Sequence, residues 1–404
     1  MVIIKGYKTE LKLNNQQKTA CVKHCGAARF AYNWGLRQKI ATYQETGQSP
    51  SAIDLHKQLN LLKQNELSWL YEVSKCAPQE SLRDLDKAYA NFFRRVKQGD
   101  KEVGFPKFKS RKHGLGSFRL TGSIKVFERS IQLPRLGKLR LKESGYIPTC
   151  GVKILSATVS EQAGRWFVSV QVEQQVSDPL PNSNEIIGVD LGIKSMAICS
   201  NGLTFDNPKP LKAKTKQLKR WQQRLSRRVK GSQNRKKAQR KVAIIHARIA
   251  NIRANALHQA TAKIIAQKPQ VIVLEDLNIK GMVKNHKLAR AISDVGMGEF
   301  RRQIDYKAKG QAISIVYADR WFPSSKTCSH CGNVKLELSL AERVYTCDFC
   351  GLTLDRDLNA AINLKNTVSS TGIYACGESV SPDLLRQFSA KQELNTMLAM
   401  SNFG

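Results

Sequence analysis

Acidic residues are scarce in this sequence. Only 32 Asp and Glu stand against 66 Lys and Arg, which leaves a formal net charge of +34. Between Asn207 and Leu274 the chain has no Asp or Glu at all, although it carries nineteen Lys and Arg there. Ordinary surface charge rarely leaves so large an excess uncompensated, so we expect a long polyanionic partner, a nucleic acid.

The sequence also lacks a long apolar run. No stretch approaches the roughly eighteen consecutive apolar residues of a membrane-spanning helix, and the N-terminus has no apolar core of a signal peptide. We therefore expect a protein of the prokaryotic cytoplasm, associated with the nucleoid through DNA binding and without a membrane partner.

Nothing in the sequence indicates a disulfide framework. Cys21 and Cys25 flank His24 like a ligand cluster, but the helical pattern of the residues that follow favours ordinary packing. Of the ten cysteines, six are scattered, as is typical of free thiols: Cys21, Cys25, Cys76, Cys150, Cys199 and Cys376.

The other four cysteines form two Cys-x-x-Cys pairs. Cys328 and Cys331 make the first pair, Cys347 and Cys350 make the second, and fifteen residues separate the pairs. Four thiolates at this spacing are typical of one structural Zn²⁺ held between two knuckles. The sequence therefore predicts a zinc ribbon here.

The first half of the chain passes from a helical to a strand pattern. After one short N-terminal strand, apolar residues recur at helical spacing for about a hundred residues. Short alternating segments follow between about 117 and 178, which favours a small antiparallel barrel that the first strand could join. Where the helical block ends, basic residues alternate with Phe92, Phe93, Phe105 and Phe108. Such a mixture suits phosphates and stacked bases, but for Phe92 and Phe93 we favour packing in a core.

The second half opens with an apolar strand that carries Asp190 in its middle. Because a buried carboxylate is costly unless it is paired or binds metal, Asp190 is a candidate site residue. Asn201-Gly202 predicts a hairpin between the next two strands. The acid-free segment then has apolar stripes at helical spacing, which favours a basic helical hairpin with one face on a core; coiled-coil dimerisation is the alternative.

Further acids follow two later elements. Glu275 and Asp276 end a buried strand, and only one of them can share a pocket with Asp190, because adjacent strand residues face opposite ways. Asp355 and Asp357 precede a helix-forming run, and their spacing does not choose between them. Three carboxylates from separate core elements can hold two divalent ions for phosphodiester hydrolysis. Carboxylates favour Mg²⁺ or Mn²⁺, whereas thiolates favour Zn²⁺.

Four motifs together resemble the TnpB family, RNA-guided nucleases of small insertion sequences that are related to type V CRISPR effectors: GVDLG, VIVLED, WFPSSKTC with its paired knuckles, and DRDLNAAIN. The resemblance implies a multidomain α/β protein. An RNase H-like RuvC nuclease domain would contain the zinc ribbon, and a small β-barrel wedge domain would carry a helical recognition insertion. The implied boundaries are 1–13 for the first wedge strand, 14–116 for the recognition domain, 117–180 for the rest of the barrel, 181–320 for the nuclease domain with its basic hairpin at 211–265, 321–353 for the zinc ribbon, 354–368 for the end of the nuclease domain, and 369–404 for a weakly ordered tail.

The resemblance also implies which acids act. It selects Asp190, Glu275 rather than Asp276, and Asp357 as the catalytic, magnesium-binding residues of a DNA endonuclease. Asp355, by its position, is then expected to cap the helix that follows. All three family acids are present, which implies an active enzyme.

The implied partners are a guide RNA from the element's end and double-stranded target DNA. The RNA would pair with the target strand beside a short motif that the protein reads, and the chain would act as a monomeric ribonucleoprotein. A transposase that performs strand transfer, or an RNA-guided DNA-binding regulator without cleavage, is the alternative. Candidate nucleic-acid contacts are Lys75, Gln79 and Thr121 for the adjacent motif, and Arg220, Arg224, Arg227 and Arg228 of the basic hairpin.

Overall fold

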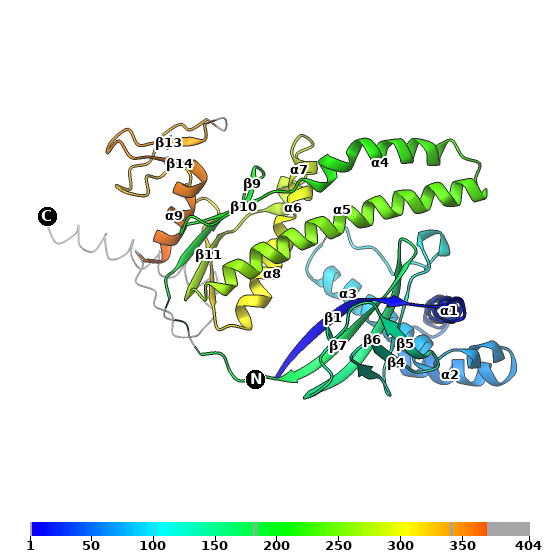
Figure 1. The fold of residues 1–404 in the computed structure, drawn as a ribbon. Coiled ribbons are helices and arrows are strands. Elements are labelled where there is room, and N and C mark those ends of the chain that lie inside the picture. Colours follow the sequence, from blue (N-terminus) through cyan, green and yellow to red (C-terminus); the bar gives the residue numbers. More distant parts are fainter. Residues whose placement is uncertain (1, 101, 181, 183, 340–341, 370–404) are drawn as a thin grey trace. The chain divides into compact units, whose positions relative to one another are not determined.

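The computed structural model describes residues 2–100, 102–180, 182, 184–339 and 342–369. The chain divides into two compact units, Met1–Asp178 and Pro179–Gly404 (Figure 1). The expected tail at 369–404 lies, apart from its first residue, outside the described residues. No described helix is long and apolar enough to cross a membrane.

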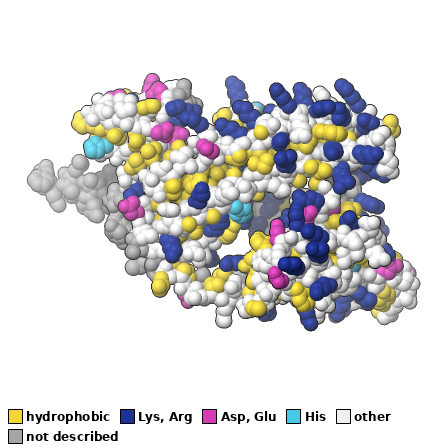
Figure 2. Space-filling model, viewed as in Figure 1, with side chains coloured by type: hydrophobic (Ala, Val, Ile, Leu, Met, Phe, Trp, Pro, Cys, Tyr) yellow, Lys and Arg dark blue, Asp and Glu magenta, His cyan; other side chains and the backbone are white. Residues whose placement is uncertain are grey.

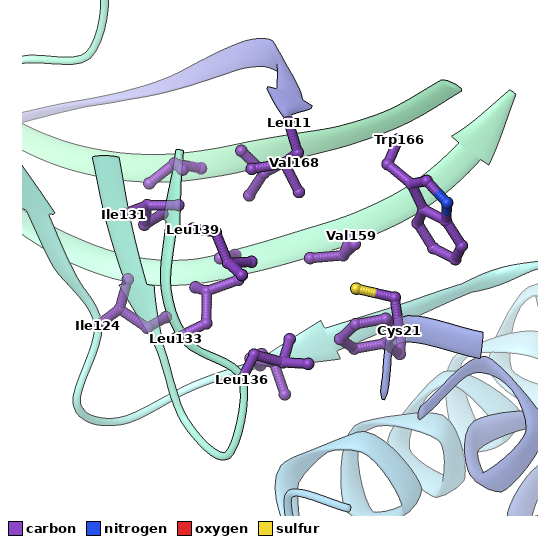
Figure 3. Packing of buried hydrophobic residues seen from close by; sticks show 14 of the residues in the cluster. Leu11, Cys21, Ile124, Ile131, Leu133, Leu136, Leu139, Val159, Trp166 and Val168 are labelled. Carbon is purple, nitrogen blue, oxygen red and sulfur yellow. The ribbon is translucent and has the colours of Figure 1, made fainter. Parts of the chain in front are cut away.

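A seven-stranded antiparallel sheet frames the first unit, in the order β2-β6-β7-β1-β5-β4-β3. The N-terminal strand pairs with β7 and β5, so the residues between β1 and β2 are an insertion between strands of one sheet. One face of the sheet lines a single core around Leu11, Ile131, Val159 and Val168 (Figure 3), so the sheet curls around it, with β2 and β3 at its edges. The strands are β1 (Val2–Lys12), β2 (Ser117–Leu120), β3 (Lys125–Phe127), β4 (Ser130–Leu133), β5 (Gly137–Leu141), β6 (Val152–Gln162) and β7 (Arg165–Gln175).

The insertion is helical, with α1 (Asn15–Thr46), α2 (Ala52–Asn65) and α3 (Cys76–Lys97). His24 lies inside it and has both ring nitrogens engaged: Nδ1 lies 2.8 Å from the Ala20 carbonyl oxygen, and Nε2 accepts from the Ser74 amide at 3.0 Å. Burial raises the pKa of the Cys21 and Cys25 thiols to about 12, which disfavours the metal-binding thiolates. The predicted packing role of this cluster is confirmed.

The aromatic residues at the end of α3 only partly follow the prediction. Phe92 is half-buried, but Phe93 is 55% exposed, so core packing was wrong for Phe93. The ring centroids of Phe92 and Phe93 lie 5.2 Å apart in an edge-to-face arrangement, and the Phe105 centroid lies 5.5 Å from that of Phe92. The reason is that the last turns of α3 contact the extended segment containing Phe105, and the helical core lies further back along α3 around Leu82 and Leu85.

A mixed five-stranded sheet frames the second unit, in the order β10-β9-β8-β11-β12. The strands β8, β11 and β12 run parallel, while β9 is antiparallel to both β8 and β10. The turn at Asn201-Gly202 joins β9 to β10, which confirms the predicted hairpin. The strands are β8 (Ile187–Asp190), β9 (Ser195–Cys199), β10 (Thr204–Asp206), β11 (Val271–Glu275) and β12 (Ser314–Ala318).

Helices cover both faces of this sheet. Ile272 and Leu274 of β11 belong to the core formed with α5 and α8, whereas Val271 and Val273 pack with Leu364 of α9. The helices are α4 (Pro210–Ser226), α5 (Gln233–Ala266), α6 (Ile279–Met282), α7 (Ala289–Val295), α8 (Met297–Lys309) and α9 (Arg356–Ser369).

Helix α9 approaches the sheet closely at Gly188 of β8. A Cβ atom at this position would lie 2.1 Å from the Ala361 carbonyl oxygen and 2.6 Å from the Lys365 amide nitrogen, both in the backbone of α9. Only glycine therefore lets α9 pack this tightly on β8.

The acid-free segment forms the predicted helical hairpin of α4 and α5. Leu218 of α4 packs between Ile245 and Ile249 of α5. Helical spacing predicts Val229 as the last residue of the apolar stripe of α4, but Val229 lies in the turn between the helices and is 77% exposed, so the stripe ends before it.

A buried acid outside the hairpin fixes the start of α4. Asp294 of α7 accepts hydrogen bonds from the Leu211 amide at 3.0 Å and the Lys212 amide at 3.2 Å. The Arg253 guanidinium of α5 lies 3.0 Å from the same carboxylate. Asp294 therefore caps α4, which has no side-chain cap from its own N-cap residue, and ties it to α5.

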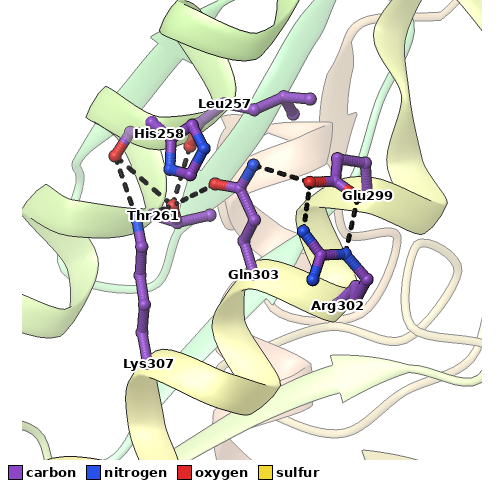
Figure 4. A network of polar contacts seen from close by, with 7 residues as sticks. All are labelled: Leu257, His258, Thr261, Glu299, Arg302, Gln303 and Lys307. Carbon is purple, nitrogen blue, oxygen red and sulfur yellow. Dashed lines mark hydrogen bonds and ion pairs between the residues drawn. The ribbon is translucent and has the colours of Figure 1, made fainter. Parts of the chain in front are cut away.

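A polar network joins the other end of α5 to α8 (Figure 4). The Thr261 hydroxyl and Gln303 Oε1 lie 3.0 Å apart, and Lys307 Nζ donates to Thr261 Oγ1 at 2.6 Å. Gln303 Nε2 donates to Glu299, which also accepts two hydrogen bonds from Arg302. Because Thr261 and Gln303 are fully buried, these bonds are needed to satisfy their polar atoms.

Candidate functional site

Two candidate acids end neighbouring parallel strands. Asp190 is the last residue of β8, not in its middle as predicted, because the chain leaves the sheet at the following Leu191-Gly192. Glu275 is the last residue of β11. Leu274 pairs with Val189 in the parallel register, so Glu275 and Asp190 are the next opposed residues. The two acids therefore lie at the same edge of the sheet.

The alternation of β11 separates Glu275 from Asp276. Val271 and Val273 face α9, and Glu275, two residues after Val273, faces the same side of the sheet. Asp190 likewise faces the same side as Gly188, two residues before it on β8. The Asp276 carboxylate is instead held by two guanidinium groups, Arg301 at 3.1 Å and Arg320 at 2.7 Å.

The third acid lies at the start of α9. Asp355 Oδ1 accepts from the amides of Asp357 at 2.9 Å and Leu358 at 3.1 Å, which confirms that Asp355 is the N-cap. Asp357 stands in the first turn, and Arg356 Nε lies 3.4 Å from its Oδ1. One turn further along α9, Ala361 touches Gly188, two residues before Asp190.

The acids influence one another electrostatically. Burial, followed by the charges of Glu275 and Asp357, raises the pKa of Asp190 to about 8, against a smaller opposite effect of Arg356. A site that disfavours a third negative charge is one that a divalent cation would stabilise. The Sγ atoms of the four cysteines lie within 4.8 Å of one another, and among the described residues no other group of three or more candidate metal ligands clusters in this way. The carboxylate oxygens of Asp190, Glu275 and Asp357 are therefore more widely spaced than the four sulfurs.

The loop after β12 completes the surroundings of Glu275, and the sequence analysis missed it. Ser324 is buried and its hydroxyl donates to Glu275 Oε1 at 2.6 Å. Arg320 and Phe322 line a pocket of about 170 Å³ together with Glu275. The sequence marks this loop only by the adjacent serines in WFPSS. Periodic patterns predict helices and strands, and they do not show which strand a loop residue will contact.

Two asparagines of α9 hold this loop in place. Asn363 Nδ2 donates to the carbonyl oxygens of Ser324 at 2.7 Å and Thr327 at 2.6 Å. Asn359 donates to Thr327 at 2.7 Å and accepts from the Ser329 amide at 3.0 Å. The helix that carries Asp357 therefore also fixes the entry to the first knuckle.

The four cysteines fit a zinc ion. Cys328 Sγ lies 3.7 Å from Cys350 Sγ, and Cys331 Sγ lies 3.6 Å from Cys347 Sγ. Zn–S bonds of about 2.3 Å in a tetrahedron place sulfurs about 3.8 Å apart. The Cys350 amide points to Cys347 Sγ at 3.5 Å, and backbone hydrogen bonds lower the pKa of the Cys347 thiol to about 6. A short pair, β13 (Val344–Thr346) and β14 (Thr353–Asp355), flanks the second knuckle, and β14 leads directly into α9.

The candidate nucleic-acid contacts fall on two surfaces. At the start of α3, the N-cap residue Lys75 is exposed and Gln79 is half-buried. Cys76, which lies between them in the sequence, donates from Sγ to the Thr121 carbonyl oxygen at 3.4 Å. The four arginines of the hairpin are exposed, on and just after α4, where Figure 2 shows Lys and Arg gathered: Arg220, Arg224, Arg227 and Arg228.

Comparison with known proteins identifies the family of the chain. A family model described as "Probable transposase" (OrfB_IS605) matches residues 169–286, and one described as "Cas12f1-like, TNB domain" matches residues 298–364. A protein of Streptomyces pristinaespiralis named "Putative RNA-guided DNA endonuclease" is 36% identical, over 94% of this chain and 92% of its own length. The chain belongs to the TnpB family.

A second relative supports the same family assignment. "Putative RNA-guided DNA endonuclease InsQ" of Escherichia coli is 32% identical over 93% of this chain and 95% of its own length. The solved structure "Structure of the mini-RNA-guided endonuclease CRISPR-Cas_phi3" has a TM-score of 0.48 and 9% identity, and covers 94% of each chain. A model described as "Helix-turn-helix domain" matches residues 1–48. There the structure has β1 and one continuous helix, α1, within that range.

Proposed function

We propose that the protein is an RNA-guided DNA endonuclease of a transposable element. The observation that carries this function is the convergence of Asp190, Glu275 and Asp357 at one edge of the mixed sheet, where two of them raise the pKa of the third. The names of the TnpB relatives add the RNA guide and the DNA substrate.

We assign the second unit to an RNase H-like, RuvC-type nuclease. Three antiparallel strands followed by two parallel ones, with helices on both faces, support this assignment. The zinc ribbon at 321–353 is then an insertion before α9, with 181–320 and 354–368 as the two parts of the nuclease domain. In the first unit, 1–13 and 117–180 form the wedge and 14–116 the recognition insertion.

The three acids are suited to hold Mg²⁺ or Mn²⁺. When bound, such ions activate water and stabilise the leaving oxygen of a phosphodiester. Ser324 orients Glu275 through its hydrogen bond, and the Asp355 cap fixes the first turn of α9 and with it Asp357. The carboxyl of Asp190 must lose its proton before it can bind a cation. One Zn²⁺ on the four cysteines holds the ribbon.

The basic hairpin is suited to a nucleic acid backbone. Its exposed arginines cannot lose their charge and bind phosphates in a forked geometry. We assign the hairpin to the guide RNA and target DNA, and Lys75, Gln79 and Thr121 to the target-adjacent motif. The active particle is a monomeric ribonucleoprotein.

Substitution of single acids tests the function. With the RNA that copurifies and a DNA target that matches it, Asp190→Ala and Asp357→Ala should abolish Mg²⁺-dependent cleavage and retain RNA binding. Asp206→Asn is the matched control, because Asp206 is an exposed acid at the end of β10 in the same sheet. Persistent cleavage by Asp357→Ala would overturn the assignment.

Strand transfer is the second candidate function, favoured by the family description "Probable transposase". A transposase would join DNA ends, whereas an endonuclease hydrolyses them. Labelled element ends incubated with the ribonucleoprotein and a target plasmid distinguish the two, since only strand transfer places the label in the plasmid.

A further inference from the structure

Trp321 is the most exposed tryptophan in the described chain, with 84% of its surface accessible. Trp carries a large apolar surface that proteins usually bury. A ring this exposed is therefore a candidate contact for a ligand. The segment around it is not a loose loop.

Both neighbours of Trp321 are anchored. The Trp321 amide donates to Asp319 Oδ1 at 2.8 Å, which fixes the turn. Arg320, before it, donates to the Asp276 carboxylate at 2.7 Å, and Phe322, after it, packs in the core with Val271 and Val273. The backbone that presents the indole ring is therefore held on both sides by β11.

The same neighbours place this turn beside Glu275, one of the three candidate acids. Arg320 and Phe322 line a pocket with Glu275 and Asp276, and two residues later Ser324 donates to Glu275 itself. A flat, exposed aromatic ring on a fixed turn beside an acid site is suited to stack on one base. In a duplex both faces of each base are covered by neighbours, so the ring requires an unpaired base.

We propose that Trp321 stacks on one unpaired nucleobase of the DNA strand whose phosphodiester lies at Asp190, Glu275 and Asp357. This proposal rests on the proposed function. The stack sets the register of the strand, so that one phosphate is presented to the acids. Trp321 thus acts as a positioning residue that determines where the strand is cut.

Cleavage kinetics of three variants test the positioning role. Loss of one base–aromatic stack corresponds to about a tenfold or larger change. Trp321→Ala should therefore lower the cleavage rate at subsaturating DNA by about tenfold and spread the cut over several phosphates, whereas Trp321→Phe should retain most of the rate and the single position. Leu180→Ala is the control, since Leu180 is also 84% exposed and lacks a ring. Wild-type rate and cut position for Trp321→Ala would overturn the proposal.

Abasic nucleotides identify the stacked base. A single abasic position in the DNA should reproduce the loss seen with Trp321→Ala, and the two losses should not multiply when combined, because both remove the same stack. Losses that multiply at every position would refute a direct stack.

Tryptophan fluorescence separates this proposal from the nuclease assignment. In the Asp190→Ala background, where no cleavage is expected, a single-stranded DNA oligonucleotide of mixed sequence should quench part of the emission, and Trp321→Phe should remove that part. Equal quenching with Trp321→Phe would refute the stack. If the quenching is present and wild-type protein does not cleave, the stack stands and the proposed function fails.

Discussion

Replacement of Gly188 by alanine should test whether the packing of α9 positions the third acid. The added Cβ would lie 2.1 Å from the Ala361 carbonyl oxygen, and Cβ contacts below 3.0 Å essentially do not occur. The helix must therefore retreat by about 0.9 Å, the difference between 3.0 and 2.1 Å. All three of the nearest atoms that the Cβ would meet belong to the backbone of α9, so no side chain can move aside instead.

This displacement should reach the geometry of the three proposed catalytic acids. Asp357 lies four residues before Ala361, on the same face of α9 one turn away, so it moves with the helix. A misplacement of about 1 Å can reduce a rate about 100-fold. We expect Gly188→Ala to lower the cleavage rate by about that factor, to retain RNA and target binding, and to reduce the free energy of unfolding by about 1–3 kcal/mol through overpacking.

The assay is single-turnover cleavage of the matching DNA target, with urea denaturation alongside. Gly298→Ala is the matched control, because Gly298 lies in α8 and a Cβ there would meet only Ile279 Cδ1 at an ordinary 3.6 Å. Cleavage by Gly188→Ala at the wild-type rate, with normal stability, would show that the close approach does not set the position of Asp357.

Three further predictions follow from the described contacts. Asp294→Ala leaves Arg253 and the first amides of α4 without their shared acceptor, so the free energy of unfolding should fall by about 3 kcal/mol in urea titrations; the same loss in the exposed control Asp206→Ala would contradict this. Because the pKa of Asp190 is raised to about 8, its proton must leave before a cation binds. Calorimetric Mg²⁺ affinity should therefore rise between pH 6 and 8 and level off above, and a flat profile would be evidence against the site. Metal analysis should find about one zinc per chain, and Cys347→Ser should lose it; zinc retained by this variant would exclude the four-thiolate centre.

Local patterns in the sequence were enough to predict most elements of the fold. The Asn201-Gly202 turn and the basic hairpin each depend on neighbouring residues, and both occur as expected. The cysteine spacing predicted a four-sulfur cluster because two short knuckles leave little freedom for their sulfurs. The N-cap role of Asp355 could likewise be predicted, since it depends on the next three residues only.

Features that depend on distant residues could not be predicted. The cap that Asp294 provides to Leu211 joins residues far apart in the sequence, with no periodic signal. Spacing alone leaves Glu275 and Asp276 open, because it does not show which face of β11 meets α9, and only the family resemblance favours Glu275. The sequence predicts Asp190 in mid-strand because apolar residues continue on both sides, whereas in the structure the strand ends at this residue.

The two asparagines of α9 have a consequence for protein design. Asn359 binds the chain at Thr327 and Ser329, where the ribbon begins, and the chain returns at Arg356, less than one helical turn before Asn359. The two ends of the ribbon are therefore tied together by the core itself. The entropy of closing a loop grows only slowly with its length. A grafted module, longer or shorter and without any metal, could then replace the knuckles between Ser329 and Asp355, and Asp357 would keep its position.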